Sequence, residues 1–265
     1  MKLSSLSIYP LKSITGIHLQ HSGVTKKGLL YDRNWTLIDD NNKVITARDY
    51  PILLRLSCQL DEYSLEIYQN EQHVLSIPKE IKSNLSEEIQ IFSSKANGLI
   101  YSDEINTWFS DYLGISTRLM VVDFDKERVI LEKHGGKPND IVGFADQNPL
   151  LLISEASLGE LNSRLDTPVT MTHFRPNIVV SGCEPFAEDN WKYFSIGDCD
   201  FEVVQPCQRC IFTTIDPVTA QKSLDMEPLK TLSKYRKLST GGIEFGVHVI
   251  PRKLGKVKLG DRLEL

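Results

Sequence analysis

Residues 201–215 read Phe-Glu-Val-Val-Gln-Pro-Cys-Gln-Arg-Cys-Ile-Phe-Thr-Thr-Ile, two apolar runs joined by a proline and a Cys-x-x-Cys pair. β-branched and aromatic residues dominate both runs, which predicts one strand over 201–205 and a second over 210–215. Cys207 and Cys210 then lie where one strand ends and the next begins. A thiolate is the ligand form of cysteine, and the guanidinium of Arg209 would favour it over the neutral thiol.

Three interpretations of this pair stay open on these residues alone. A structural zinc site would also recruit Cys183 and Cys199, but such sites usually use two closely spaced pairs and this sequence has one Cys-x-x-Cys. A dithiol redox motif needs a helix after the second cysteine, whereas residues 211–215 favour a strand. In the third interpretation both cysteines are small core residues, the commonest role of an arbitrary cysteine.

On both sides of this stretch the sequence predicts short strands with a few helices, so the expected fold class is mainly β. The first part predicts strands over 3–9, 17–24, 35–38, 43–47, 53–60 and 64–68, with a hairpin turn at 39–42. Apolar residues at helical spacing predict a helix over 104–113, and a buried strand over 119–122 follows. The second half predicts strands over 150–153 and 177–181, a helix capped by Ser154, a short helix over 229–235 and closing strands.

Bulk composition bounds the function. The chain has 265 residues, 41% hydrophobic and 25% charged, and a formal charge of −5. This balance gives no global attraction to nucleic acid or to an anionic membrane surface, so a bound anion must meet a local cluster of cations. No apolar run of about 18 residues and no secretory h-region occur, and the cysteine count is odd, which together predict a cytoplasmic protein in a reducing compartment.

One such local cluster is predicted from residues that are distant in the sequence. Lys12 and Ser13 follow the first predicted strand, Arg33 precedes the strand at 35–38, and Arg175 and Asn177 open the strand at 177–181. Arginine matches phosphate with a planar two-point fork, and lysine and serine add further donors. These groups are expected to grip a phosphate-bearing cofactor if the fold brings them together.

These segments, together with several others, resemble the MOSC family in its two-part form. The matching blocks are Ile8 to Ser13, Gly28-Leu29, Asp32 to Trp35, Val44 to Arg48, Ser154 to Leu158, Leu161-Asn162, Phe174 to Asn177, Glu188-Asp189, Trp191, Pro206 to Cys210, Thr213-Thr214 and Asp216-Pro217. The resemblance implies an N-terminal MOSC β-barrel domain over residues 1–120. It also implies a MOSC domain of the molybdenum cofactor sulfurase C-terminal type over residues 121–265.

The resemblance further implies a site and a reaction. Cys210 is expected to ligate molybdenum, Cys207 to lie near the metal without ligating it, and Gln208 stands where relatives often have serine. The expected contacts to the molybdenum-molybdopterin cofactor are Lys12, Ser13, Arg33, Arg175, Asn177 and Arg209. The implied activity is two-electron reduction of N-hydroxylated small molecules such as amidoximes and hydroxylamines, as in the amidoxime-reducing members of the family.

The resemblance also implies partners and leaves two alternatives. The sequence has no four-cysteine spacing of an iron-sulfur cluster, and neither a ferredoxin-type domain nor a membrane anchor is expected. Electrons are therefore expected from a separate flavoprotein or iron-sulfur protein, with no nucleic acid and no membrane as partners. One alternative is a non-enzymatic carrier of the cofactor or of sulfur that uses the same Cys210. Another is a divergent protein that has kept the fold and lost the cofactor.

Overall fold

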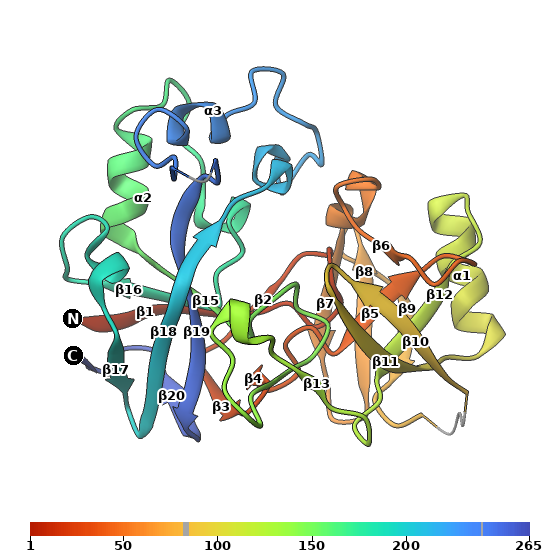
Figure 1. Ribbon diagram of the computed structural model, residues 1–265. Helices are drawn as coiled ribbons and strands as arrows, with labels where there is room; N and C mark the ends of the chain where they lie inside the picture. The colour runs from red at the N-terminus through yellow and green to blue at the C-terminus, as the bar shows by residue number, and fades with distance from the viewer. Residues whose placement is uncertain (82–84, 240) are drawn as a thin grey trace.

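The computed structural model describes residues 1–81, 85–239 and 241–265, and it confirms a mainly β fold with two halves (Figure 1). The described residues form three α-helices: α1 (Asp103–Leu113), α2 (Glu155–Asn162) and α3 (Leu229–Leu232). They also form five short 3-10 helices: η1 (Pro51–Arg55), η2 (Glu132–His134), η3 (Met171–His173), η4 (Ala187–Asn190) and η5 (Ile211–Thr214). None of the helices in the described part of the chain has the length and apolarity needed to cross a bilayer.

An eight-stranded sheet organises the C-terminal half, in the order β2-β1-β16-β15-β19-β18-β17-β21. Its strands are β2 (Ile17–His18), β1 (Lys2–Ile8), β16 (Ile178–Ser181), β15 (Leu150–Ser154), β19 (Glu244–Lys253), β18 (Cys199–Gln208), β17 (Tyr193–Ile196) and β21 (Leu263–Glu264). β15 and β16 pair in parallel, and the other neighbours pair antiparallel. A small sheet of β20 (Gly255–Lys258), β3 (His21–Thr25) and β4 (Gly28–Leu29) adjoins it.

The N-terminal half contains two further antiparallel sheets. One has the order β10-β11-β12-β5-β6, and the other has the order β7-β8-β9. Their strands are β10 (Ser86–Ile91), β11 (Ser94–Ile100), β12 (Arg118–Val122), β5 (Trp35–Ile38), β6 (Val44–Ile45), β7 (Leu56–Leu60), β8 (Ser64–Gln69) and β9 (Gln72–Pro78). A two-stranded ladder of β13 (Arg128–Val129) and β14 (Ile141–Val142) follows in the chain before the C-terminal half begins.

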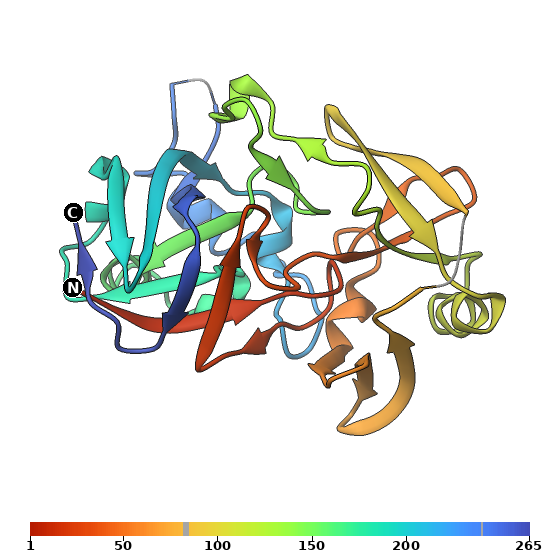
Figure 2. The ribbon, with the colours of Figure 1, turned by 90° about the horizontal axis from the view of Figure 1, so that it is seen from below.

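The first strand ties the two halves together. β1 pairs with β16, and its apolar side chains are buried in the core of the C-terminal half. Directly after β1 the chain enters the other half, where Leu11 and Ile14 belong to the N-terminal core. Figure 2 shows β1 running from the N-terminus across the C-terminal half toward the N-terminal half. Lys12 and Ser13 therefore lie where the halves meet, and this pairing crosses the domain boundary predicted at residue 120.

Local chemistry explains the elements that the sequence predicted well. Asp39 Oδ1 accepts from the backbone N–H groups of Asn41 and Lys43 at 2.9 Å each, which closes the hairpin turn between β5 and β6. Ser154 Oγ accepts from the N–H of Ser157 at 3.1 Å and caps α2, as predicted. These interactions form within a few residues, so sequence patterns report them reliably.

The prediction of a strand over 210–215 was wrong, because the chain forms the 3-10 helix η5 directly after Cys210. Thr213 Oγ1 donates to the carbonyl of Cys210 at 3.0 Å, and Thr214 Oγ1 donates to that of Ile211 at 2.8 Å. Such local side-chain bonds compete with a strand ladder and outweigh the β-propensity of the threonines. The predicted strand over 53–60 likewise begins only at Leu56, because η1 opens at Pro51.

A glycine in β19 gives a test of how tightly this sheet is packed. Gly246 has φ +77°, and a Cβ there would lie 2.5 Å from Ile153 Cγ1 and 2.8 Å from the Leu152 carbonyl oxygen. Gly246→Ala should therefore lower the free energy of unfolding by roughly 2–5 kcal/mol in urea titrations, through left-handed strain and overpacking. Gly159→Ala in α2 is the matched control. A Cβ there meets nothing within 4 Å, so the change should stabilise by about 0.5–1 kcal/mol. Equal stability of the two variants would contradict the packing described here.

Candidate functional site

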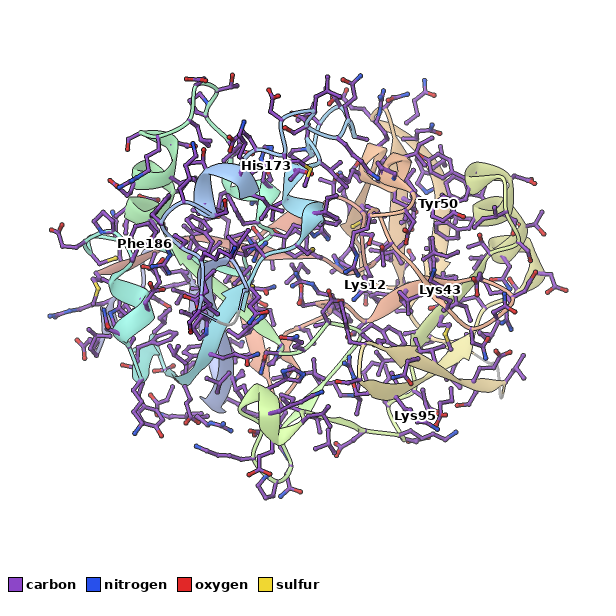
Figure 3. The ribbon with its side chains drawn as sticks, turned by 45° about the horizontal axis from the view of Figure 1, so that its top comes forward. Lys12, Lys43, Tyr50, Lys95, His173 and Phe186 are labelled. Atoms are coloured by element: carbon purple, nitrogen blue, oxygen red, sulfur yellow. The ribbon has the colours of Figure 1, made fainter. Side chains whose placement is uncertain are left out.

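A cavity of about 350 Å³ lies where the two halves meet, and all seven predicted site residues line it. They are Lys12, Ser13, Arg33, Arg175, Asn177, Arg209 and Cys210. Figure 3 shows Lys12 in the middle of the molecule, between the two halves. The fold thus brings together residues that are up to about 200 positions apart in the sequence.

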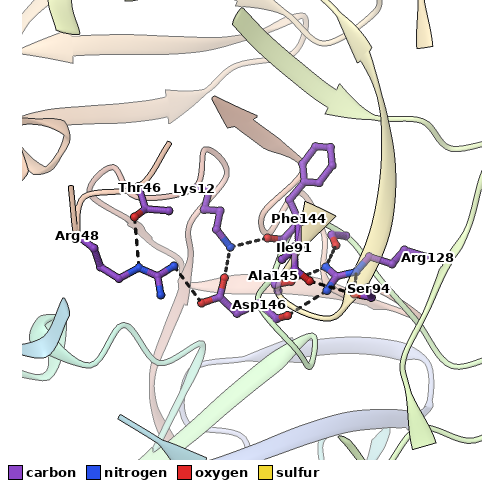
Figure 4. Close-up of polar contacts among 10 residues, drawn as sticks. Lys12, Thr46, Arg48, Ile91, Ser94, Arg128, Phe144, Ala145 and Asp146 are labelled. Atoms are coloured by element: carbon purple, nitrogen blue, oxygen red, sulfur yellow. Dashed lines mark hydrogen bonds and ion pairs between the residues drawn. The ribbon is translucent and has the colours of Figure 1, made fainter. Parts of the chain in front are cut away.

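Lys12 and Ser13 reach the cavity at the end of β1. Lys12 is buried, donates to the carbonyl of Phe144 at 2.9 Å and forms an ion pair with Asp146 (Figure 4). Ser13 is also buried, and its hydroxyl has no hydrogen-bond partner among the residues that the structure describes. A hydroxyl that lies on a cavity wall without a protein partner is available to a ligand.

Two arginines from different halves share one aromatic ring. The guanidinium carbons of Arg33 and Arg175 lie 4.4 Å and 4.1 Å from the ring centroid of Tyr9. Arg33 Nη1 also donates to Asp32 Oδ2 at 2.6 Å, and Arg175 Nη1 donates to the carbonyl of Ile14 at 2.7 Å. Burial lowers the pKa of Arg175 to about 10, so the group still carries its positive charge at neutral pH.

Asn177 uses its amide on the protein itself. Its Oδ1 accepts from Arg33 Nη1 at 2.9 Å and from the N–H of Leu151 at 3.2 Å. Its Nδ2 donates to the carbonyl of Ser7 at 3.1 Å. The amide of Asn177 therefore holds Arg33 and links β1 to β15.

Three of the predicted site residues have a strained backbone conformation. Ser13, Arg33 and Arg175 have φ angles of +76°, +47° and +55°, in the left-handed region that disfavours side chains other than glycine. Strain of this kind costs on the order of 1–3 kcal/mol per residue and persists only where surrounding contacts enforce it, most often at functional sites.

The two cysteines have different environments. Cys207 is buried at the end of β18, whereas Cys210 is exposed and forms the N-cap of η5. Arg209 Nη1 donates to Cys207 Sγ at 3.0 Å, and its Nη2 donates to the carbonyl of Phe174 at 2.8 Å. The sequence analysis applied the charge of Arg209 to the cysteine pair as a whole, and in the fold the guanidinium bonds to Cys207. Burial alone would raise the pKa of Cys207, but the charges of Arg209 and His248 lower it to about 6.

The remaining cysteines do not join this pair. Cys199 is fully buried in the core of the C-terminal half, and neither Cys199 nor Cys183 lines the cavity. Within residues 1–81, 85–239 and 241–265, no cluster of three or more histidine, cysteine or acidic side chains is arranged to hold a metal. The structural zinc interpretation therefore has no support, and η5 is a short 3-10 helix rather than the α-helix of a dithiol motif.

The cavity is cationic although the whole chain is acidic. Its lining includes five cations, Lys12, Arg33, Arg48, Arg175 and Arg209. Asp146 is the carboxylate among the described lining residues. Burial opposes its ionisation, but Lys12 above all, and then Arg48 and Arg33, keep the pKa of Asp146 below its usual value. The local excess of positive charge suits an anionic ligand.

The lining residues that the sequence reasoning did not select include Arg48, Phe92, Asp146 and His248. Arg48 follows β6 closely, just as Lys12 follows β1, so the same strand-end argument would have selected it. Asp146 belongs to a polar run ahead of the apolar strand β15, which is a weaker signal. Phe92 and His248 carry no signal that residue type or spacing reveals.

Comparison with known proteins gives matches along almost the whole chain. The family model described as the MOSC N-terminal beta barrel domain matches residues 1–116, and the MOSC domain model matches residues 139–264. The chain is 33% identical to mitochondrial amidoxime-reducing component 1 of Danio rerio, over 98% of this chain and 83% of that protein. For the Homo sapiens protein of the same name the identity is 34%, over 99% and 82%. A molybdenum cofactor sulfurase of Oryza sativa subsp. japonica is 32% identical over 92% of this chain and 32% of its own length.

The lowered pKa of Cys207 predicts a pH dependence of stability. Its pKa falls from 9.0 to about 6 on folding, so between these values the unfolded chain binds the proton that the folded chain has released. Wild type should therefore become more stable than Cys207→Ala as the pH rises from 6 to 9. The difference between their free energies of unfolding should grow by at most about 4 kcal/mol. Below pH 6 the charge contributes nothing.

Urea unfolding at a series of pH values measures this difference. Cys58→Ala is the matched control, because burial raises the pKa of Cys58 to about 12. The difference in free energy of unfolding between this variant and wild type should stay constant between pH 6 and 8. A flat profile for Cys207→Ala as well would show that the thiol is not ionised in the folded protein.

Proposed function

Because this chain belongs to the MOSC family, with a MOSC N-terminal β-barrel domain followed by a MOSC domain, we propose that it binds a molybdenum cofactor and reduces N-hydroxylated small molecules. The observation that carries this proposal is the exposed thiol of Cys210 on a cavity lined by five cations. A soft thiolate suits molybdenum, and the cations suit the phosphate of a pterin cofactor.

The side chains of the cavity fit such a group. Cys210 would ligate the metal, and Lys12, Ser13, Arg33, Arg175 and Arg209 would contact the pterin and its phosphate. The hydroxyl of Ser13 is free, and Arg209 Nε is buried without a hydrogen-bond partner in the described part of the chain. An unsatisfied buried donor costs about 1–3 kcal/mol, which an anionic ligand would recover. Asn177 would act through Arg33, which it holds in place.

The proposed reaction converts a hydroxylamine or amidoxime into the reduced base and water, with two electrons and two protons consumed as the N–O bond breaks. When bound, the cofactor supplies the two electrons for this cleavage. The cations of the lining would fix its orientation and compensate its negative charge. The exposure of Cys210 keeps this end of the cavity open to a small-molecule substrate.

The electrons must be replaced after each turnover. We propose that a separate flavoprotein or iron-sulfur protein delivers them, docking at the side of the molecule where Cys210 is exposed. Electron transfer needs close approach to the metal, and an exposed metal ligand permits it.

A second candidate function is a carrier of the cofactor or of sulfur, in which Cys210 passes its ligand on without turnover. The similarity to a molybdenum cofactor sulfurase favours this alternative. Both functions use the same thiol. Measuring metal content together with substrate turnover therefore distinguishes them.

Substitution of the proposed ligand tests both candidates. Wild-type protein from a host that makes the cofactor should contain about one molybdenum per chain by elemental analysis. Cys210→Ser should lose most of this metal, because a serine hydroxyl is a much weaker ligand than a thiolate for a soft metal site. With a chemical reductant, this variant should reduce benzamidoxime at least 100-fold more slowly than wild type. Cys207→Ser should retain far more of both metal and turnover.

Cys183→Ser is a matched control, since Cys183 is partly exposed and lies outside the cavity lining. It should equal wild type in metal content and rate. Full metal retention by Cys210→Ser would exclude this residue as the ligand. Molybdenum in wild type without any reduction of N-hydroxylated compounds would favour the carrier.

A further inference from the structure

We propose that Phe92, supported by Arg48, is a specificity residue of the cavity that binds the planar, unsaturated body of the substrate. This inference rests on the proposed function, because it concerns the molecule on which the site acts. It follows from the place of Phe92 at the opening of the cavity, from its local conformation and from the contacts that hold it there.

Three residues of the cavity lining are exposed to solvent, and they mark its opening. Phe92 comes from the N-terminal half, and Gln208 and Cys210 come from the C-terminal half. Phe92 is 56% exposed although its side chain is apolar. Figure 1 shows the hairpin of β10 and β11, which carries Phe92 at its turn, directed toward the C-terminal half. A substrate that enters this cavity from solvent would thus have an exposed aromatic ring on its wall.

Neither turn chemistry nor core packing accounts for a phenylalanine at this position. Ile91 pairs with Ser94, so Phe92 and Ser93 form a two-residue hairpin loop. Phe92 has φ +50°, a conformation for which such loops normally use glycine or asparagine. Exposure of a large apolar side chain and a left-handed backbone are both locally unfavourable. At Phe92 the two occur together on the lining of the cavity, where a role in binding would account for them.

The ring is held by a chain of polar contacts rather than left free. The guanidinium of Arg48 lies 5.4 Å from the Phe92 ring centroid. Arg48 Nε donates to Thr46 Oγ1 at 3.3 Å, and its Nη2 lies 3.9 Å from Asp146 Oδ2 (Figure 4). One side of the aromatic group is therefore supported by a cation, an interaction that fixes the orientation of a ring.

A second arginine fixes the hairpin to the cavity wall. Arg128 Nε donates to Ser94 Oγ at 2.9 Å, and its Nη2 donates to the carbonyl of Asp146 at 3.0 Å (Figure 4). Its Nη1 donates to the carbonyl of Ala145 at 2.6 Å. The turn that carries Phe92 and the segment that carries Asp146 are thus joined through one guanidinium, and the ring keeps its position at the opening.

These contacts favour one class of substrate body. A preoriented aromatic ring attracts a planar π system that stacks on it or meets its edge, whereas a small saturated group gains little. Aromatic contacts of this kind correspond to roughly a 2- to 12-fold change in binding. The expected preference is for N-hydroxylated groups attached to an aromatic or heteroaromatic ring.

The test uses holoprotein and two matched probe pairs. Benzamidoxime and acetamidoxime are compared as substrates with a chemical reductant, and benzamidine and acetamidine are compared as ligands by calorimetry. Phe92→Asn removes the ring and suits the left-handed turn, so its unfolding temperature should equal or exceed that of wild type. It should lower the kcat/KM ratio of benzamidoxime to acetamidoxime by about 2- to 12-fold and weaken benzamidine binding by a similar factor.

Phe124→Ala is the matched control. Phe124 is 59% exposed and has Lys27 Nζ 4.5 Å from its ring centroid, but it does not line the cavity. This variant should leave both ratios at wild-type values. An unchanged ratio and unchanged benzamidine binding in Phe92→Asn would overturn the specificity role, as would equal losses for the aromatic and aliphatic probes. A wild-type holoprotein that reduces neither amidoxime would instead overturn the proposed function, while benzamidine binding would still decide the role of the ring.

Discussion

The pairing of β1 with β16 is the constraint on which the cavity depends. It places the first residues of the chain in the sheet of the C-terminal half, so the segment that follows must cross into the N-terminal half at Lys12 and Ser13. Asn177 reinforces this crossing, because its amide bonds to Ser7 on one side and to Arg33 on the other. Ligands gripped by residues of both halves would therefore also bind the halves to each other.

Two carboxylates and several backbone carbonyls partly compensate the five cations of the cavity. Asp32 and Asp146 supply the opposite charges, and the carbonyls of Ile14, Phe144 and Phe174 accept hydrogen bonds from Arg175, Lys12 and Arg209. Leaving such groups buried without partners would cost several kcal/mol each. Arg209 Nε and the Ser13 hydroxyl have no hydrogen-bond partner in the described part of the chain, and both residues line the cavity. The positive φ angles at Ser13, Arg33 and Arg175 fit the same picture of a site whose contacts hold a strained backbone.

The two cysteines illustrate how neighbours in sequence can differ in chemistry. Both are close to Arg209 along the chain, yet the guanidinium bonds to buried Cys207 and leaves Cys210 at the N-cap of η5, exposed to the outside. A buried thiolate held by arginine is well shielded, whereas an exposed thiol can accept a metal and meet a substrate. Membership of the MOSC family and the different environments of the two thiols together support Cys210 rather than Cys207 as the metal ligand in the proposed function.

The sequence by itself determined the mainly β fold class, the hairpin turn after β5, the cap of α2 and seven of the residues that line the cavity, among them Lys12 and Cys210. It could do so because residue propensities, capping and cations at strand ends are properties of a few adjacent positions, and because many ordered blocks resembled one family. Only the tertiary structure decided that η5 replaces a strand, that Arg209 acts on Cys207, and that Phe92, Asp146 and His248 join the site. Those outcomes depend on contacts between segments far apart in the sequence, such as Asn177 with Ser7, 170 residues away, which no local pattern of residues specifies.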